Sequence, residues 1–157
     1  MKKLKEEIRK LLLTEDFQKN PKIINVFPPQ KTASALFSFL YSTDKIIKEN
    51  AVIAMGEVVS NIAEQNIEQA RIIMRRLMLS LTEESGGIGW GAPLAMGEIM
   101  ARNSILAEEY HKILFSYAEE DDNFLDFEEL QKEVVTAIHR VSEVHPHLFK
   151  NFNIPGK

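Results

Sequence analysis

The 157-residue chain contains no cysteine, so disulfide bonds, thiolate nucleophiles and sulfur-ligated metals are all excluded. Aromatic residues make up only 8% of it. No run of 18 apolar residues occurs, so no segment is expected to span a membrane. The first residues alternate charged with apolar side chains and lack the uninterrupted apolar core of a signal peptide. These absences together predict a cytoplasmic protein.

Neither sign of charge dominates the composition. The chain has 23 acidic and 19 basic residues, a formal net charge of −4, which is too little positive charge for an electrostatic nucleic-acid footprint. Its 45% apolar and 27% charged residues are ordinary for one globular domain of this length. We therefore expect a single domain over residues 1–157, with no nucleic-acid partner and no membrane partner.

An internal repeat of about 41 residues runs through the chain. The tetrapeptide AMGE at residues 54–57 recurs at residues 95–98, a step of 41 residues. The same step relates the apolar positions of the segments before them, and a weaker third copy follows 42 residues after the second. Because a fixed period of this length is typical of stacked helix pairs, three units are predicted, at 30–63, 66–103 and 105–144.

Each unit has the apolar spacing of two amphipathic helices. The pairs are predicted at 30–42 with 44–63, at 66–84 with 92–103, and at 105–118 with 127–144. Residues 1–29 form an N-terminal cap, with an amphipathic helix at 2–13 and then an irregular segment. That segment carries Ile23, Ile24, Val26 and Phe27, so we expect it to lie against the first unit. Residues 145–157 form a tail.

The second helix of the first unit resembles that of a HEAT repeat. The positions that carry the resemblance are Asp44, Ile47, Lys48, Ala51, Ala54, Met55 and Gly56. The resemblance covers residues 30–144 and implies an all-α fold, a right-handed stack (an α–α superhelix) of about three HEAT-like hairpins with an N-terminal capping helix. In that family an acidic residue at the Asp44 position and a basic one at the Lys48 position commonly interact across neighbouring repeats. Here the second unit has Ser85 and Gly89 in those places and the third has Phe127 and Gln131, so the charged ladder is not expected beyond the first unit. The resemblance also implies that the chain serves as a binding scaffold.

The run at residues 86–91 holds four of the seven glycines. It lacks the preceding strand and the spacing of a dinucleotide-binding loop, and no Lys with Ser or Thr follows it as in a phosphate loop. Two readings stay open, a plain turn between helices or a contact with a partner or an anion. Trp90, the single tryptophan, is either an interface anchor or a cover for this turn.

Helical projection predicts a groove on the side of the second helices that faces away from the core. We expect a partner to bind there and at the glycine-rich loop, through Ile53, Gly56, Gly89, Trp90, Gly91, Leu94, Gly97 and His139. A glycine within a helix costs about 1 kcal/mol relative to alanine, so close approach of a partner would offset the cost of the two helical glycines. The alternative is that a terminal helix or another subunit packs on them.

The expected function is that of a non-enzymatic scaffold or adaptor, which binds a protein partner through the concave face and the glycine-rich loop. The alternative is a small-ligand or cofactor-associated enzyme accessory protein that uses Trp90 and His139. His139 is expected beside Glu98 of the preceding unit, and such a pair can do acid–base work. No nucleophile accompanies it, so no catalytic residue, metal or cofactor is expected.

Overall fold

The computed structural model describes residues 2–82 and 85–156, and the fold of these residues is all-α. Every helix among them is too short or too polar to cross a lipid bilayer. The α-helices are α1 (Lys2–Leu12), α2 (Pro29–Leu40), α3 (Lys45–Gln65), α4 (Ile67–Leu79), α5 (Ala92–Arg102), α6 (Ser104–Ser116) and α7 (Glu128–Val144). Shorter 3₁₀ helices are η1 (Phe17–Lys19), η2 (Pro21–Val26) and η4 (Pro146–Phe149).

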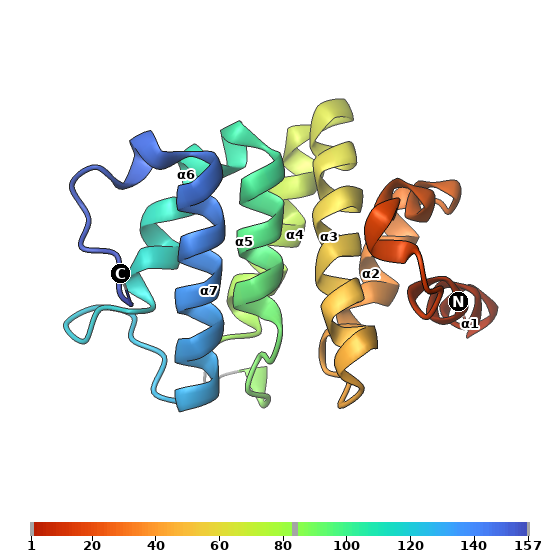
Figure 1. The fold of residues 1–157 in the computed structure, drawn as a ribbon, viewed down its shortest axis with the longest axis horizontal. Helices are drawn as coiled ribbons and strands as arrows, with labels where there is room; N and C mark the ends of the chain where they lie inside the picture. The colour runs from red at the N-terminus through yellow and green to blue at the C-terminus, as the bar shows by residue number, and fades with distance from the viewer. Residues whose placement is uncertain (1, 83–84, 157) are drawn as a thin grey trace.

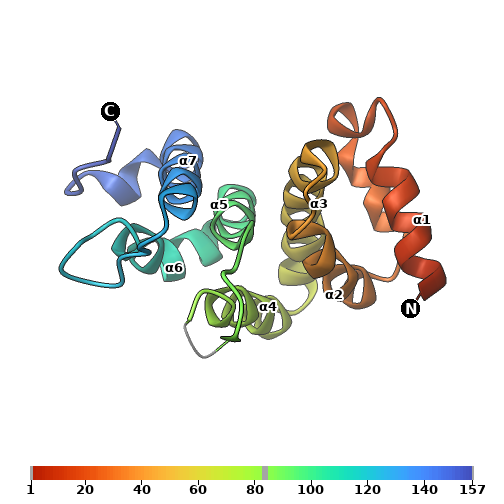
Figure 2. The ribbon, with the colours of Figure 1, turned by 90° about the horizontal axis from the view of Figure 1, so that it is seen from below.

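The helices form two layers. The inner layer, α3, α5 and α7, faces the viewer in Figure 1, and Figure 2 shows the outer layer, α2, α4 and α6, behind it. Helix α5 lies between α3 and α7 and packs against both, while each outer helix precedes its inner partner in the chain. Helix α1 packs against α2 and α3 at one end of the stack. The inner helices all run in the same direction, so their N-termini lie at one edge of the molecule (Figure 1).

Side-chain caps fix several helix starts. Asp44 accepts hydrogen bonds from the backbone N–H groups of Ile46 and Ile47 at the start of α3. Asn66 and Asn103 cap α4 and α6 in the same way. Such residues satisfy backbone donors that a helix cannot pair internally, and these three helices begin within one residue of their predicted starts.

The predicted apolar stripes form the core. Met55 of α3 and Met96 of α5, which the repeat places at equivalent positions, are both fully buried. The outer layer is joined by charged side chains as well as by the core, because Arg71 of α4 binds Glu109 of α6. This ion pair joins the outer helix of the second hairpin to that of the third.

Two segments depart from the predictions. Helix α4 ends at Leu79 instead of continuing to residue 84. Beyond it the N–H groups of Leu81 and Thr82 bond in tight turns three residues back, and the Ser80 carbonyl accepts a hydrogen bond from Ser85 Oγ; residue 84 itself lies outside the described residues. The segment expected to be irregular forms η1 and η2, and Ile24 is buried against the first hairpin as expected. Val26, however, is 72% exposed, so only part of that segment lies against the hairpin.

Candidate functional site

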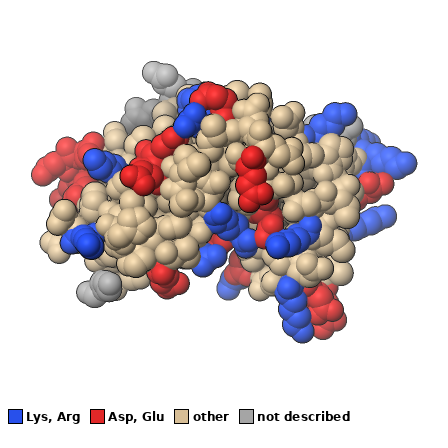
Figure 3. All heavy atoms as spheres, turned by 90° about the horizontal axis from the view of Figure 1, so that it is seen from above, with Lys and Arg blue, Asp and Glu red and all other residues tan. Residues whose placement is uncertain are grey.

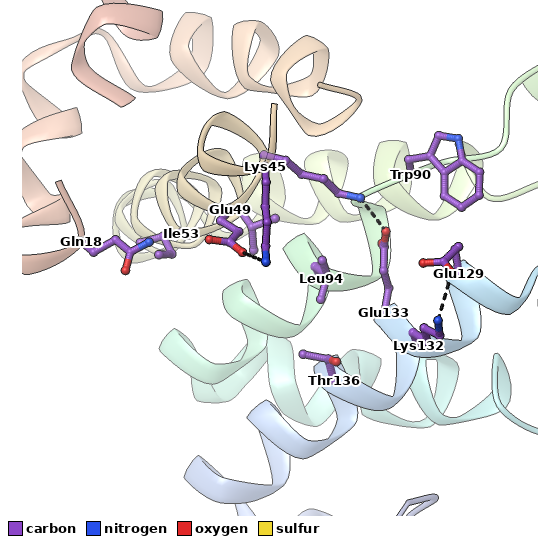
Figure 4. Close-up of a pocket in the computed structure, with 12 residues that line it drawn as sticks. Gln18, Lys45, Glu49, Ile53, Trp90, Leu94, Glu129, Lys132, Glu133 and Thr136 are labelled. Atoms are coloured by element: carbon purple, nitrogen blue, oxygen red, sulfur yellow. Dashed lines mark hydrogen bonds and ion pairs between the residues drawn. The ribbon is translucent and has the colours of Figure 1, made fainter. Parts of the chain in front are cut away.

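The inner layer carries a hollow of about 700 Å³ between α3 and α7, floored by the first turns of α5. Figure 4 shows its side chains converging from these helices and from the loop before α5. The lining consists of Gln18, Lys45, Lys48, Glu49, Val52, Ile53, Trp90, Leu94, Glu129, Lys132, Glu133 and Thr136. Three of the residues predicted for the groove, Ile53, Trp90 and Leu94, therefore do lie together in one depression.

The glycine-rich loop holds Trp90 at the end of this hollow. Gly89 and Gly91 on either side of it have φ angles of +79° and +82°, a region that other residues rarely adopt. A Cβ atom at Gly91 would lie 2.8 Å from the Leu40 carbonyl oxygen, and one at Gly89 would lie 2.7 Å from that of Ser80. Both glycines are buried. These glycines therefore shape the turn, and the side chain they present is that of Trp90; their contact with a partner stays a prediction.

A buried carboxylate ties three hairpins together beside Trp90. Glu133 of α7 accepts a hydrogen bond from Lys48 Nζ of α3 at 2.9 Å and one from the Gly91 N–H at 2.9 Å. Burial raises the pKa of Glu133 above its ordinary value, while the Lys48 ammonium and the Gly91 N–H act in the opposite direction. The Glu133 side chain is only 9% exposed, and both of its oxygens have partners. This carboxylate is thus a structural bridge between α3, the α5 N-terminus and α7.

The other charged side chains of the hollow also form pairs of opposite charge. Lys45 lies 3.9 Å from Glu49 on the α3 wall, and Lys132 lies 3.1 Å from Glu129 on the α7 wall. Each lysine of the lining therefore has a glutamate partner, and the lining carries no net charge. A ligand in the hollow would therefore contact apolar side chains and the buried Lys48–Glu133 pair, with two exposed ion pairs along the rim.

A second set of ion pairs joins the inner helices beyond the C-terminal end of the hollow. Arg102 of α5 binds Glu57 of α3 and Glu98 of α5, and Glu98 in turn binds Arg140 of α7. Figure 3 views the molecule from this end and shows basic and acidic side chains gathered where the inner face is hollowed. The largest apolar part of the inner face therefore lies at the N-terminal halves of α3, α5 and α7, whereas charged side chains line it toward the C-terminal halves.

The structure places Gly56 and Gly97 differently from the prediction, which had them on the groove. Both are buried. A Cβ atom on Gly56 would lie 2.9 Å from Arg102 Nε, and one on Gly97 would lie 2.7 Å from the Ala137 Cβ. These glycines let α3, α5 and α7 approach one another closely, so helix packing, rather than a partner, offsets their cost.

His139 is also placed differently from the prediction. Its Nε2 lies 2.9 Å from the Pro155 carbonyl oxygen of the C-terminal tail, and it does not line the hollow. Glu98, its expected neighbour, is engaged by Arg102 and Arg140 instead. The imidazole–carboxylate pair considered from sequence is therefore absent from the described residues, and within them no group of three or more potential ligands could hold a metal ion.

Sequence reasoning missed Lys48 and Glu133 as neighbours, because 85 residues separate them. A signal for Glu133 was present. It stands between Leu130 and Ala137 on the stripe of α7 that is otherwise apolar and buried. A carboxylate on a core stripe is rarely buried unless a partner lies nearby.

With this geometry in view, the chain can be compared with known proteins. It is similar to an uncharacterized protein from the archaeon Archaeoglobus fulgidus, with 30% identity over 118 residues. That region is 75% of this chain and 58% of the archaeal protein, so the chain spans little more than half the length of this relative. No family model matches the chain, and no solved structure matches it. The likeness extends over most of the chain but assigns it no activity.

The Glu133 bridge leads to a stability prediction. Replacing Glu133 by alanine leaves the buried Gly91 N–H without an acceptor, which is expected to cost about 1–3 kcal/mol of the free energy of unfolding. Replacing it by glutamine keeps an oxygen acceptor in place and should cost less. Urea denaturation of both variants measures the difference. Equal costs would show that the Gly91 hydrogen bond contributes nothing and that only the ion pair with Lys48 matters.

Proposed function

We propose that the chain is a non-enzymatic protein-interaction module of the HEAT-repeat kind, which binds a segment of a protein partner in the hollow of its inner layer. The observation that carries the proposal is the hollow itself. It is open to solvent, with Leu94 on its floor, Ile53 on its α3 wall and Trp90 at its end (Figure 4). Interfaces are anchored by aromatic residues at such places, surrounded by a charged or polar rim.

The 41-residue period and the paired helices support the HEAT-like part of the proposal. The charged ladder of the family adds no support, because Lys48 pairs with Glu133 of the third hairpin and not with a neighbouring repeat. Asp44 caps its own helix instead. Repeat stacks of this type use their inner surface as an extended binding face. A cytoplasmic adaptor or scaffold is the role that fits this surface.

A small-ligand function is the second candidate. The observation that favours it is the volume of about 700 Å³, which lies within the usual range of ligand pockets. Its sequence-based form also required His139, which lies outside the hollow. The charged side chains of the lining pair with one another, so none is left unpaired to orient a small molecule, and the protein-binding function is preferred.

Blocking the hollow without touching the core tests the proposal. Thr136 is an exposed residue of the α7 wall, so Thr136→Arg should fill part of the hollow and leave the melting temperature nearly unchanged. Ser38→Arg, at an exposed position of the outer helix α2, is the matched control. Affinity purification from native extract should recover a protein with the wild type and with Ser38→Arg, and lose it with Thr136→Arg. Recovery of the same proteins with all three would place binding elsewhere.

A further inference from the structure

Resting on the proposed function, we infer that the segment bound in the hollow is about two turns of an amphipathic α-helix whose buried stripe is uncharged. The inference specifies the conformation and the chemistry of the partner, neither of which follows from the presence of a binding face alone. It stands on the shape of the hollow, on the arrangement of its charges and on the apolar residues at its open end.

The shape is that of a short valley between two parallel helices. One wall runs from Lys45 to Ile53 of α3, about 12 Å at 1.5 Å per residue. The other runs from Glu129 to Thr136 of α7, about 10 Å by the same measure. Leu94 of α5 lies on the floor between them (Figure 4). A helix laid along such a valley continues the side-by-side packing of the inner layer, and about two turns fill its length.

The charges specify the buried face of that helix. Lys48 and Glu133 neutralise each other within the hollow, and the remaining four charged groups are paired along its walls. A charged partner side chain over Ile53 and Leu94 would lose its hydration and find no unpaired counter-charge, which is costly. The stripe that enters the valley must therefore be apolar or neutral, whereas charges of either sign can meet the rim.

The walls also present their rim charges in opposite order. Along α3 a lysine, Lys45, precedes a glutamate, Glu49, whereas along α7 Glu129 precedes Lys132. Because the two helices run in the same direction, a partner helix meets both signs on each flank, one turn apart. This pattern suits a surface helix that carries acidic and basic residues on either side of its apolar stripe.

The N-terminal end of the valley extends the apolar contact. There the rings of Trp90 and Phe127 meet edge to face, with centroids 6.1 Å apart. Phe127 is 52% exposed, and Ile46, in the first turn of α3, is 57% exposed. At the opposite end the ion pairs of Arg102 with Glu57 and Glu98 make the surface charged, so the apolar contact extends toward Trp90. Apolar residues at positions i, i+4 and i+7 of the partner would then contact the floor and this aromatic pair.

Selection from peptide libraries tests the inference with the intact chain. Two phage-displayed libraries of 14-residue peptides would be used, one on a helix-stabilised scaffold and one linear, both without tryptophan. Synthetic copies of the enriched peptides are then titrated while the fluorescence of Trp90, the single tryptophan, is recorded. We expect uncharged apolar residues at i, i+4 and i+7, a shift in Trp90 emission, and affinity reduced at least tenfold by a proline at the centre of the peptide. Thr136→Arg should weaken binding at least tenfold, and Ser38→Arg less than twofold.

The outcomes separate this inference from the function on which it rests. Enriched peptides that alternate apolar and polar residues, or tolerate the central proline, yet still fail to bind the Thr136→Arg variant, would overturn the helical partner and leave the binding hollow intact. Peptides that bind Thr136→Arg as well as the wild type, or no enrichment from either library, would overturn both.

Discussion

Replacing Gly97 by leucine is expected to abolish the cooperative unfolding transition of the protein. The backbone of α5 lies so close to α7 at this residue that even a Cβ atom would be 2.7 Å from the Ala137 Cβ and 2.9 Å from the Ala137 Cα. A leucine adds three further carbon atoms, and no flexible side chain stands in the way that could move aside. The gain in helix propensity, about 1 kcal/mol, is small beside the forced separation of α5 from α7.

Circular dichroism during thermal denaturation measures this effect. Gly87→Leu is the matched control, because nothing lies within 4 Å of a Cβ atom at that loop glycine. The free energy of unfolding of this control should lie within about 0.5 kcal/mol of the wild-type value, as is usual for surface substitutions. A Gly97→Leu variant that melts as sharply as Gly87→Leu would mean that α5 and α7 are farther apart than the structure places them.

The second large effect is expected at the two repeat-related methionines. Met55 and Met96 have no exposed surface, so truncation of either to alanine should cost about 2–5 kcal/mol of the free energy of unfolding. Glu49→Ala on the same face of α3 as the hollow should be nearly neutral, because its side chain is 51% exposed and its ion pair with Lys45 lies at the surface.

Urea denaturation of the three variants compares these costs on one scale. Similar losses at Met55 and Met96 would confirm that the repeat places them in equivalent core positions. A loss at Glu49 as large as that at Met55 would contradict the assignment of this face to the hollow.

The helices could be predicted from sequence because their determinants are local. The apolar spacing of α3 and α5, the cap Asp44 and the proline at the start of α2 each act within a few residues. The same reasoning places Ile53 and Leu94 on the open side of their helices, where the structure has them.

The extent of the hollow could not be predicted in this way. Helical projection treats each helix as isolated. It therefore assigns Gly97 to the side away from the core, although α7 packs against α5 at that residue. The pairing of Lys48 with Glu133 could not be predicted for the same reason, because it joins the first hairpin to the third. Contacts of this kind depend on how the hairpins stack, which no single helix encodes.

The position of Glu133 also bears on how the stack responds to strain. In a stack of repeats each unit normally holds only its immediate neighbours, so one end can loosen while the other stays folded. Here one carboxylate of the last hairpin reaches a lysine of the first and a backbone amide of the second. A bulky ligand that moved α3 away from α7 would break the contact between this buried carboxylate and its lysine partner, and little water could replace the lysine there. The Glu133 bridge thus opposes widening of the hollow, so a ligand must fit the existing distance between α3 and α7.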